Sequence, residues 1–502
     1  MEENILILFS DSCPREWVME LKSNLEKVTG SNVQTEHFSD TSPPVKRIPA
    51  RWSKGRYSSG SRQDAPLNGH PTRPEGIRQP GLILDLGGRK PAMTFYSGCP
   101  ILSCSLFDEA TGPLHAVVLK AIAGNSPTLH IDIRLHQENQ QPRVIKRGCF
   151  KTLIYDYRKT LDVILENLIV LIPSAVQQLD LTGQRTGLNN KKADTNWQML
   201  VDECSKNEKH HRLMHRARLF FTSETWNTGF LPFPIEKVAL ERKTKWEVEW
   251  DEELPAGSFR ADAFGIEEDG QRMVIYEKYS RNTGRLVMEH DGKSTEPLPE
   301  HDIHRSYPFL FRHKEVWYCL PEQKALKKLS LYRIDKKFHR LVHVCDIIND
   351  IEAADPSMIF LHDRWWLFFT DTTHKGADLR LCIFHSMRPE GPWTPHALNP
   401  VKTDITCARP AGHLFLHKGI AYRPAQDSSL TYGGSIRIHR IDELTPEVFR
   451  ESEVNHLLPD QLNGPYQSGW HTLSICGNGC LVDGKRSFTD PMKILRKIRL
   501  KS

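Results

Sequence analysis

The stretch Ala353–Asp371, AADPSMIFLHDRWWLFFTD, shows most clearly the pattern from which the fold can be predicted. An apolar run follows Asp355, a short polar turn interrupts it, and a second apolar run covers Trp365–Phe369. Two short apolar runs joined by a polar turn predict a pair of antiparallel β-strands. Because the same pattern recurs along the C-terminal half of the chain, this stretch is one unit of a repeat.

Five short segments mark the starts of these units. They are RADAF around Asp262, RSYPF around Tyr307, AADPS around Asp355, CARPA around Arg409 and GWHTL around His471. The markers are 45, 48, 54 and 62 residues apart. A period of about 45 residues, with about four strands in each unit, is typical of propeller blades. The sequence therefore predicts an all-β C-terminal domain over residues 226–502, a five-bladed β-propeller.

The repeat also predicts where a site lies. In an antiparallel pair, the first strand begins and the second strand ends at the same edge of the sheet. We therefore expect the five markers to surround the central depression of the propeller. The residues at the ends of the second strands should form a second ring, and they are Glu277, Glu322, Asp371, Arg423, Gln426 and Asp427. The alternative is that an acidic residue in such a turn only caps backbone amides.

Residues 1–182 have the pattern of an α/β domain. An apolar strand at Ile5–Phe9 precedes a helix that begins near Asp11 and has Pro14 in its first turn. A later apolar run between glycines, 81–88, predicts a buried parallel strand. Alternating segments at 128–135 and 143–155 predict an antiparallel extension. A basic, Ser-, Pro- and Gly-rich stretch at 41–80 predicts a flexible insert, and residues 183–225 predict a helical connector.

Composition limits the classes of function. A net charge of +5 over 502 residues gives no reason to expect a nucleic-acid partner. No signal peptide or membrane span is expected, and the apolar stretch Leu161–Ile172 predicts a buried helix. Eleven cysteines without a repeated short spacing favour a reducing compartment, so we expect a cytoplasmic protein. No set of ligands with metal spacing stands out, and we expect neither a metal nor another cofactor. The sequence makes no prediction about oligomeric state.

The repeat region resembles a known family. The segments HRSYPFLF, VWYCLPE, GPWTPHALNPV, ARPAGHLF and YRPAQD, together with the stretch around Asp355, resemble in order the N-terminal domain family named after plant glucosamine inositolphosphorylceramide transferases. That domain is similar to the five-bladed propellers of family 43 glycoside hydrolases. More faintly, ILILFSDS, LILDLGG and RGCFKT resemble a formyltransferase-like region. Formyltransferases use an Asn, His and Asp set that this sequence does not supply in an Asn-x-His motif.

The resemblance implies roles for single residues. Asp262 matches the place of the general base and Asp355 the place of the Asp that tunes the acid. Inverting cleavage also requires a protonated carboxyl as general acid. The family 43 acid has its place at Arg409, which cannot donate a proton at neutral pH. Glu322 and Glu277 are therefore the candidate acids. The expected substrate-binding residues are His304, Tyr307, Asp371, Arg409, Arg423, Gln426, Asp427 and His471.

Three functions follow as hypotheses. The first is a carbohydrate-active enzyme, of glycosyl hydrolase or glycosyltransferase type, acting on an anionic or phosphorylated sugar or glycoconjugate, because Arg409, Arg423 and His471 suit a phosphate or carboxylate. A sugar phosphate or a nucleotide sugar would fit this site. The second is a non-catalytic glycan-binding or scaffold protein that has lost the acid. The third is an amino-sugar N-formyltransferase that uses the N-terminal domain.

Overall fold

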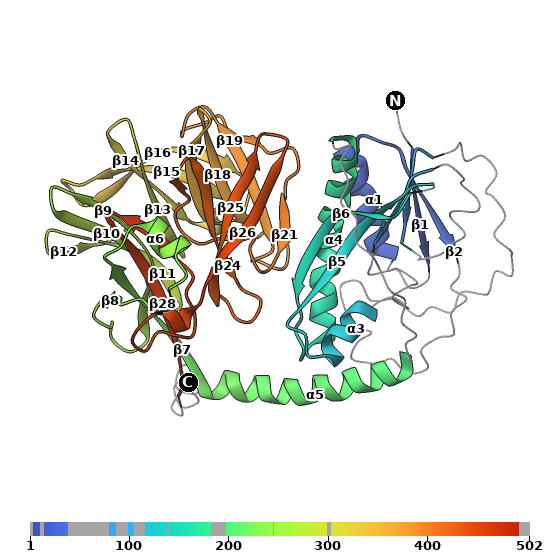
Figure 1. Ribbon diagram of the computed structural model, residues 1–502, viewed down its shortest axis with the longest axis horizontal. Coiled ribbons are helices and arrows are strands. Elements are labelled where there is room, and N and C mark those ends of the chain that lie inside the picture. Colours follow the sequence, from blue (N-terminus) through green and yellow to red (C-terminus); the bar gives the residue numbers. More distant parts are fainter. Residues whose placement is uncertain are drawn as a thin grey trace. The chain divides into compact units, whose positions relative to one another are not determined.

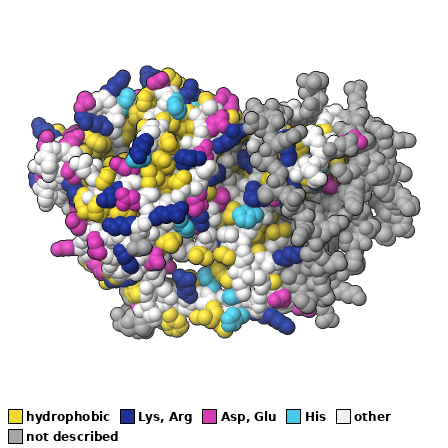
Figure 2. All heavy atoms as spheres, viewed as in Figure 1, with side chains coloured by type: hydrophobic (Ala, Val, Ile, Leu, Met, Phe, Trp, Pro, Cys, Tyr) yellow, Lys and Arg dark blue, Asp and Glu magenta, His cyan; other side chains and the backbone are white. Residues whose placement is uncertain are grey.

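The computed structural model describes residues 4–10, 15–38, 80–86, 99–104, 116–138, 140–181, 197–243, 245–298 and 303–490. The chain divides into two compact units, Met1–Arg216 and Ala217–Ser502. The predicted flexible insert at 41–80 lies almost wholly outside the described residues. Basic and acidic side chains are interspersed on the face shown in Figure 2.

The N-terminal unit is built on a mixed sheet. Its strands are β1 (Ile5–Ser10), β2 (Val33–Phe38), β3 (Leu82–Asp85), β4 (Ile101–Cys104), β5 (Thr128–His136) and β6 (Arg143–Lys151). They lie in the order β6-β5-β4-β3-β1-β2, parallel from β4 to β2 and antiparallel at β4–β5 and β5–β6. Residues Ile5–Phe9 and all of β3 are buried, as in a parallel strand covered on both faces. The predicted α/β pattern with its antiparallel extension is present.

Helices pack on this sheet. They are α1 (Arg15–Thr29), α3 (Ala116–Ala123) and α4 (Tyr157–Leu181). The long helix α5 (Trp197–Phe221) lies where a helical connector was expected and includes the division between the two units at Arg216; Nδ2 of its Asn207 donates to the carbonyl of Ala123 at the end of α3. Trp17 on the apolar face of α1 is buried, and its Nε1 donates a hydrogen bond to the carbonyl of Leu165 on α4 at 2.7 Å. The residues Tyr157–Leu179 of α4 form a helix long and apolar enough to span a membrane, but 78% of its most apolar window is buried inside the structure. The predicted buried helix is this one, and it runs on past Pro173.

The C-terminal unit contains four self-contained antiparallel sheets. Their strand orders are β12-β11-β10-β9, β13-β14-β15-β16, β22-β24-β25-β26 with β23 beside β24, and β27-β28-β7-β8. The strands of the first two are β9 (Ser258–Glu268), β10 (Gln271–Ser280), β11 (Thr283–His290), β12 (Lys293–Thr295), β13 (Ser306–His313), β14 (Val316–Glu322), β15 (Lys328–Asp335) and β16 (Arg340–Asn349). Those of the other two are β22 (Arg409–Pro410), β23 (Phe415–His417), β24 (Ile420–Asp427), β25 (Ser435–Leu444), β26 (Phe449–Leu457), β27 (Leu473–Cys476), β28 (Gly479–Thr489), β7 (Thr222–Leu231) and β8 (Glu249–Trp250). The helix α6 (Ile235–Leu240) and the short turns η3 (Lys324–Leu326) and η4 (Pro459–Gln461) complete this unit.

The prediction of five separate blades is wrong, because the described residues of this unit form four separate blades. The third repeat forms an antiparallel ladder of β17 (Ala353–Leu361), β18 (Arg364–Asp371) and β19 (Arg380–Ser386), which is not one of the four self-contained sheets. After β19 only the fragments β20 (Thr394–Pro395) and β21 (Lys402–Asp404) pair with it. Prolines 389, 392, 395 and 400 occupy this stretch. Proline has no N–H to give to a ladder, so a full outer strand does not form.

The arrangement of these strands is propeller-like. The inner strands contact one another in sequence, β9 with β13, β13 with β17 and β17 with β22. The ring closes because Gly412 bridges to Leu473 and because β27 contacts β9. The last sheet is completed by β7, whose residues pair with β28 although they lie at the opposite end of this unit's sequence, green against red in Figure 1. Residues distant in sequence therefore meet around one centre.

Candidate functional site

Three of the five markers share one unusual backbone conformation. Asp262, Tyr307 and Asp355 have φ values of 53°, 45° and 49°, which L residues rarely adopt. Each lies at a β-bulge, where two residues of the inner strand face one of its partner. For example, pairing passes from Ala354↔Thr370 to Ser357↔Phe368. The same kink is thus repeated at the same place in successive repeats, and strained backbone of this kind clusters at functional sites.

The second ring begins beside these bulges. Glu277 pairs with Ala261, and Glu322 pairs with Ser306, so each acid stands next to the marker of its own hairpin. In the fourth repeat Arg409 pairs directly with Gln426. Cross-strand partners point to the same face of a sheet. The register therefore brings the two rings to one edge.

Arg409 is the centre of one half of the cluster. Its guanidinium donates to both oxygens of Asp355, from Nε at 2.5 Å and from Nη2 at 3.2 Å, and to Asp378 at 2.7 Å. Gln426 adds a hydrogen bond to Asp355 at 2.6 Å. Glu322 accepts the backbone N–H of Asp355 at 3.1 Å and lies 3.4 Å from Lys324. Arg409 is thus held by carboxylates and is not a free fork for a phosphate, contrary to the expectation from sequence.

His471 organises the other half. Its Nε2 lies 3.1 Å from Asp262, and its Nδ1 lies 2.9 Å from Asp483. Asp483 also accepts the backbone N–H groups of Asp262, His471 and Thr472 at 3.0 to 3.2 Å. The hydroxyl of Thr472 donates to Oδ1 of Asp262 at 2.8 Å, which leaves Oδ2 without a protein donor among the described residues.

Asp483 and Asp378 are site residues that the sequence did not reveal. Asp483 is a charged residue inside the apolar strand CLVDG, and that departure from the pattern was the signal available. Asp378 lies in an irregular loop before β19, where no period places it. The same three groups, Asp262, His471 and Asp483, also have the spacing of metal ligands. Since each ring nitrogen of His471 already faces a carboxylate, no electron pair is left to hold a metal.

Glu277 has few polar contacts with the described residues. It is 7% exposed, and its Oε1 lies 3.6 Å from Nε2 of His304. The Nδ1 of His304 accepts the backbone N–H of Gly284 at 2.9 Å, which fixes the tautomer with the proton on Nε2. The side chain of His304 is 39% exposed, so it can reach a ligand.

The surroundings of the carboxyl groups shift their pKa values in opposite directions. Burial raises the pKa of Asp262, but the charge and hydrogen bond of His471 outweigh burial and hold the pKa below its usual value. Burial raises the pKa of Glu277 well above its usual value, and Asp262 and Glu322 add to the rise. Burial also raises the pKa of Asp355 to about 7 against the opposing charge of Arg409. Carboxyl groups with pKa values pushed apart in this way are suited to acid and base roles.

Three of the expected binding residues lie outside the cluster. Arg423 is fully buried and donates to Glu451 at 2.5 and 2.8 Å. Asp427 binds Arg437 at 2.8 Å. Side chains alternate along a strand, so on β24 both residues face away from Gln426. Asp371 accepts the N–H of Thr373 at 2.9 Å and lies 3.6 Å from Arg380, with no contact to the carboxyl cluster.

Tyr307 is central but inaccessible. It has no exposed surface, and its hydroxyl lies 2.8 Å from Ser357 Oγ and 2.5 Å from the backbone N of Gly412. It therefore connects three repeats from within the core and has no contact with the open side. The sequence had placed Tyr307 among the substrate-binding residues, and the structure gives it a structural position.

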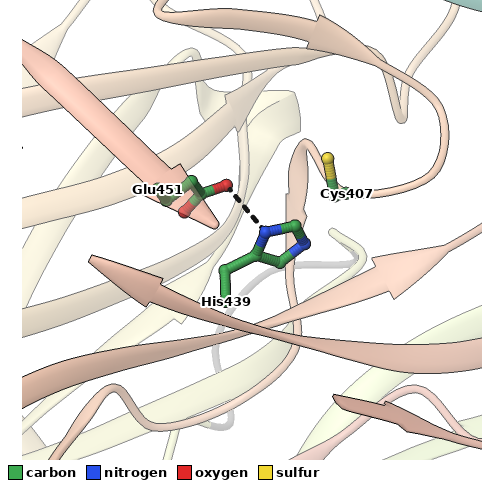
Figure 3. A group of neighbouring side chains, drawn as sticks. All are labelled: Cys407, His439 and Glu451. Atoms are coloured by element: carbon green, nitrogen blue, oxygen red, sulfur yellow. Dashed lines mark ion pairs between the residues drawn. The ribbon is translucent and has the colours of Figure 1, made fainter. Parts of the chain in front are cut away.

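A second polar cluster surrounds Glu451, away from the first. Cys407, His439 and Glu451 have ligand atoms within 4.8 Å of one another, and the ring of His439 lies between the other two (Figure 3). Lys402 and Arg423 both bind Glu451 at 2.5 Å. These two cations already exceed the single carboxylate, so a metal cation would be repelled. The cluster fits a buried ion-pair network better than a metal centre.

Part of the repeat region matches a known protein family. Residues 297–473 match the family model "Glucosamine inositolphosphorylceramide transferase 1, N-terminal". The chain is 38% identical over 174 residues to Glucosamine inositolphosphorylceramide transferase 1 of Oryza sativa subsp. japonica, which is 34% of this chain and 23% of that protein. It is 32% identical over 231 residues to the protein of that name from Arabidopsis thaliana, 43% of this chain and 30% of that protein. The predicted resemblance is confirmed, and this chain spans less than a third of the length of these relatives.

Solved structures with some likeness are glycoside-cleaving enzymes. An α-L-arabinofuranosidase from Podospora anserina has a TM-score of 0.34 and 11% identity, over 49% of this chain and 86% of that chain. An exo-β-1,3-galactanase from Phanerochaete chrysosporium has a TM-score of 0.30 and 13% identity, over 39% of this chain and 52% of that chain. A family 43 β-xylosidase/α-arabinofuranosidase from a compost metagenome has a TM-score of 0.33 and 12% identity, over 47% and 93%. These likenesses are weak and do not bear on the site residues. The likeness of residues 1–182 to formyltransferases stays a prediction.

Proposed function

We propose that the C-terminal unit is a carbohydrate-active enzyme that transfers a sugar to a hydroxyl group of a glycoconjugate, with Asp262 as general base and Glu277 as general acid. The observation that carries this proposal is the opposite displacement of two pKa values in one cluster, lowered at Asp262 and raised at Glu277. The lowered pKa favours an ionised base and the raised pKa favours a neutral acid, which is the pair that the reaction requires. The relatives, named Glucosamine inositolphosphorylceramide transferase 1, support the proposal of transfer to such an acceptor.

The proposed step uses carboxyl oxygens to which no described residue donates a hydrogen bond. Oδ2 of Asp262 takes the proton of the acceptor hydroxyl, and the acceptor oxygen forms a bond to the anomeric carbon of the donor sugar. The bond from that carbon to the leaving oxygen breaks, and Glu277 gives its proton to that oxygen. Glu322 was the other candidate acid, but its oxygens hold the backbone of Asp355 and face Lys324 and Arg409. Asp355 orients Arg409, and Gln426 in turn holds Asp355.

The burial of the carboxyl cluster favours transfer over hydrolysis. Asp262, Glu277, Glu322 and Asp355 are 1 to 7% exposed. A site with little water protects a reactive sugar from hydrolysis. Arg409 and Arg423 are engaged by carboxylates, so we place any phosphate of the substrate at the rim, beside Lys324, whose side chain is 41% exposed. The ten described cysteines are all free, which supports the proposed cytoplasmic setting.

The test is a transfer assay with single substitutions. The donors are a panel of nucleotide sugars, and the acceptor is a glycosyl inositol phosphate lipid; aryl glycosides report hydrolysis. Asp262→Asn and Glu277→Gln should each lower turnover by about 10²–10⁴-fold. Asp427→Asn is the matched control, because it removes an acid at a strand end outside the cluster, and it should keep activity. Full activity in both site variants would refute these roles.

The alternative is a glycan-binding protein without catalysis. It is favoured by the engagement of most cluster carboxylates with protein donors and by Arg409 at the place of the family 43 acid. In that case the protein binds glycans, no donor is consumed, and Glu277→Gln leaves binding unchanged. Formyl transfer by the N-terminal unit requires binding of a folate, which a titration with N10-formyltetrahydrofolate would measure.

A further inference from the structure

One aromatic side chain at the carboxyl cluster is exposed and has been given no role. Tyr432 lies on the loop 428–434 between β24 and β25, and 43% of it is exposed, whereas the cluster acids are almost fully buried. The guanidinium of Arg409 lies 5.1 Å from its ring centroid, and the ring of His471 lies 5.6 Å away. Tyr432 therefore borders both halves of the cluster.

The charged groups of the cluster act on the hydroxyl of Tyr432. Burial raises the pKa of this phenol well above its usual value, and Asp355 and Asp262 add to the rise while Arg409 opposes it. These are the same groups that surround the proposed reaction. A side chain with a deep polar end and an exposed body lies at the entrance, between solvent and the carboxyl groups.

The loop that carries Tyr432 is held by a buried lysine. Lys485 is 1% exposed, and its Nζ donates to the carbonyl of Tyr432 at 2.7 Å and to the hydroxyl of Thr431 at 2.9 Å. Burying a lysine side chain costs rotamer entropy and desolvation. Here the buried lysine donates two hydrogen bonds to the loop that carries Tyr432, which indicates that the position of Tyr432 is important for function.

Close packing fixes the loop further. The backbone N–H of Trp470 donates to the carbonyl of Gly433 at 3.0 Å. Gly433 has a φ of 56°, and a Cβ there would lie 2.8 Å from His471 Cβ and from the ring of Trp226. Only glycine allows this approach. The ring of Tyr432 is thus preorganised beside the cluster, as a binding platform requires.

We propose that Tyr432 is the stacking platform of the sugar subsite and that Lys485 is the residue that positions it. The face of an aromatic ring is electron-rich, and a pyranose presents C–H bonds on one face. A sugar lying on Tyr432 would have Arg409 and His471 beside it. This inference deepens the proposed function and rests on it.

Binding of simple sugars tests the platform without turnover. The probes are the methyl β-glycosides of glucosamine, N-acetylglucosamine, galactose and xylose, measured by saturation-transfer NMR and calorimetry with the full chain. Tyr432→Ala should weaken binding of the best probe by about tenfold, a loss of about 1.4 kcal/mol. Tyr432→Phe keeps the ring and should bind as wild type. Lys485→Met keeps the Tyr432 side chain but removes the hydrogen bonds that hold its loop. Binding should therefore weaken, while the circular dichroism spectrum stays unchanged.

Phe338→Ala is the control, because Phe338 is an exposed aromatic residue, 61% exposed, on the β15–β16 hairpin. It should not change binding. The inference is overturned if no probe binds the wild type, or if Tyr432→Ala binds as tightly as the wild type. The latter result, combined with loss of turnover in Asp262→Asn, would leave the proposed function standing without this platform. Sugar binding that depends on Tyr432, with turnover intact in Asp262→Asn and Glu277→Gln, would retain the platform and reject the catalytic roles.

Discussion

The imidazole of His471 lies 3.1 Å from the carboxylate of Asp262. Burial lowers the pKa of His471, but Asp483 and Asp262 outweigh burial and raise it to about 10. His471 is therefore a permanent cation between two carboxylates, which keeps Asp262 ionised. At Glu277 burial, Asp262 and Glu322 outweigh the charge of His471 and raise the pKa well above its usual value, which favours the protonated form. The difference between base and acid in this cluster comes from which carboxyl group His471 contacts.

Asp483→Asn tests this relationship directly. Removing one negative charge should lower the pKa of His471 toward its usual value and raise that of Asp262. Ring ¹⁵N shifts of His471, followed by NMR against pH, measure the first effect. The acidic limb of the pH–rate profile should move to higher pH, because the base is then protonated more easily.

A purely structural role for Asp483 predicts another outcome. It would lower stability and leave both the His471 titration and the position of the acidic limb unchanged. Asp442→Asn, at an exposed ion pair with Arg440, serves as the control with no effect on His471.

Stability should fall as the solution becomes alkaline. His471 has a pKa raised from 6.5 to about 10, so its contribution is complete below about pH 6.5 and is lost as the pH rises toward about 10. Glu277 and Asp355 act in the same direction, because their raised pKa values mean that the unfolded chain releases these protons first. Urea unfolding monitored by tryptophan fluorescence should give a free energy of unfolding that decreases across this window. His471→Gln should flatten the slope; an equal slope in this variant would exclude His471 as its source.

Much of this architecture follows from pattern alone. Strand alternation and the repeat of the markers predict that Asp262, Asp355, Arg409 and His471 meet, and in the structure they do. The alternation on β24 also separates Gln426 from Arg423 and Asp427, so the period of two residues could have excluded those two. The sequence does not show which charged side chains pair with one another. Asp378 neutralises Arg409 of the next repeat, and Asp483 neutralises His471 within the last repeat, and no local pattern predicts such pairing.

The buried pair of Arg423 and Glu451 should contribute strongly to stability when one partner is removed. Both side chains are 0% exposed. Arg423→Met leaves Glu451 with Lys402 alone, and we expect a loss of about 3–5 kcal/mol in the free energy of unfolding. Arg450→Met breaks a pair with Glu443 whose side chains are 54% and 39% exposed, and it should cost less than about 1 kcal/mol. Equal effects of the two substitutions in chemical denaturation would show that Arg423 has no special role.

Gly412 is the point where the fourth and last repeats touch, and its substitution should be severe. Its φ is 108°, its N–H donates to Tyr307, and it bridges to Leu473. A Cβ at this position would lie 1.9 Å from the carbonyl oxygen of Leu473, so the backbone must move. Gly257 has a similar φ of 91°, and a Cβ there would meet nothing within 4 Å. Gly257→Ala should therefore cost about 1–2 kcal/mol, the left-handed backbone penalty alone. Gly412→Ala adds the clash and should exceed about 4 kcal/mol. Because the two glycines share the backbone conformation, the difference between their thermal unfolding curves measures the closure of the ring at Leu473. Similar losses in both variants would mean that this contact does not hold the ring together.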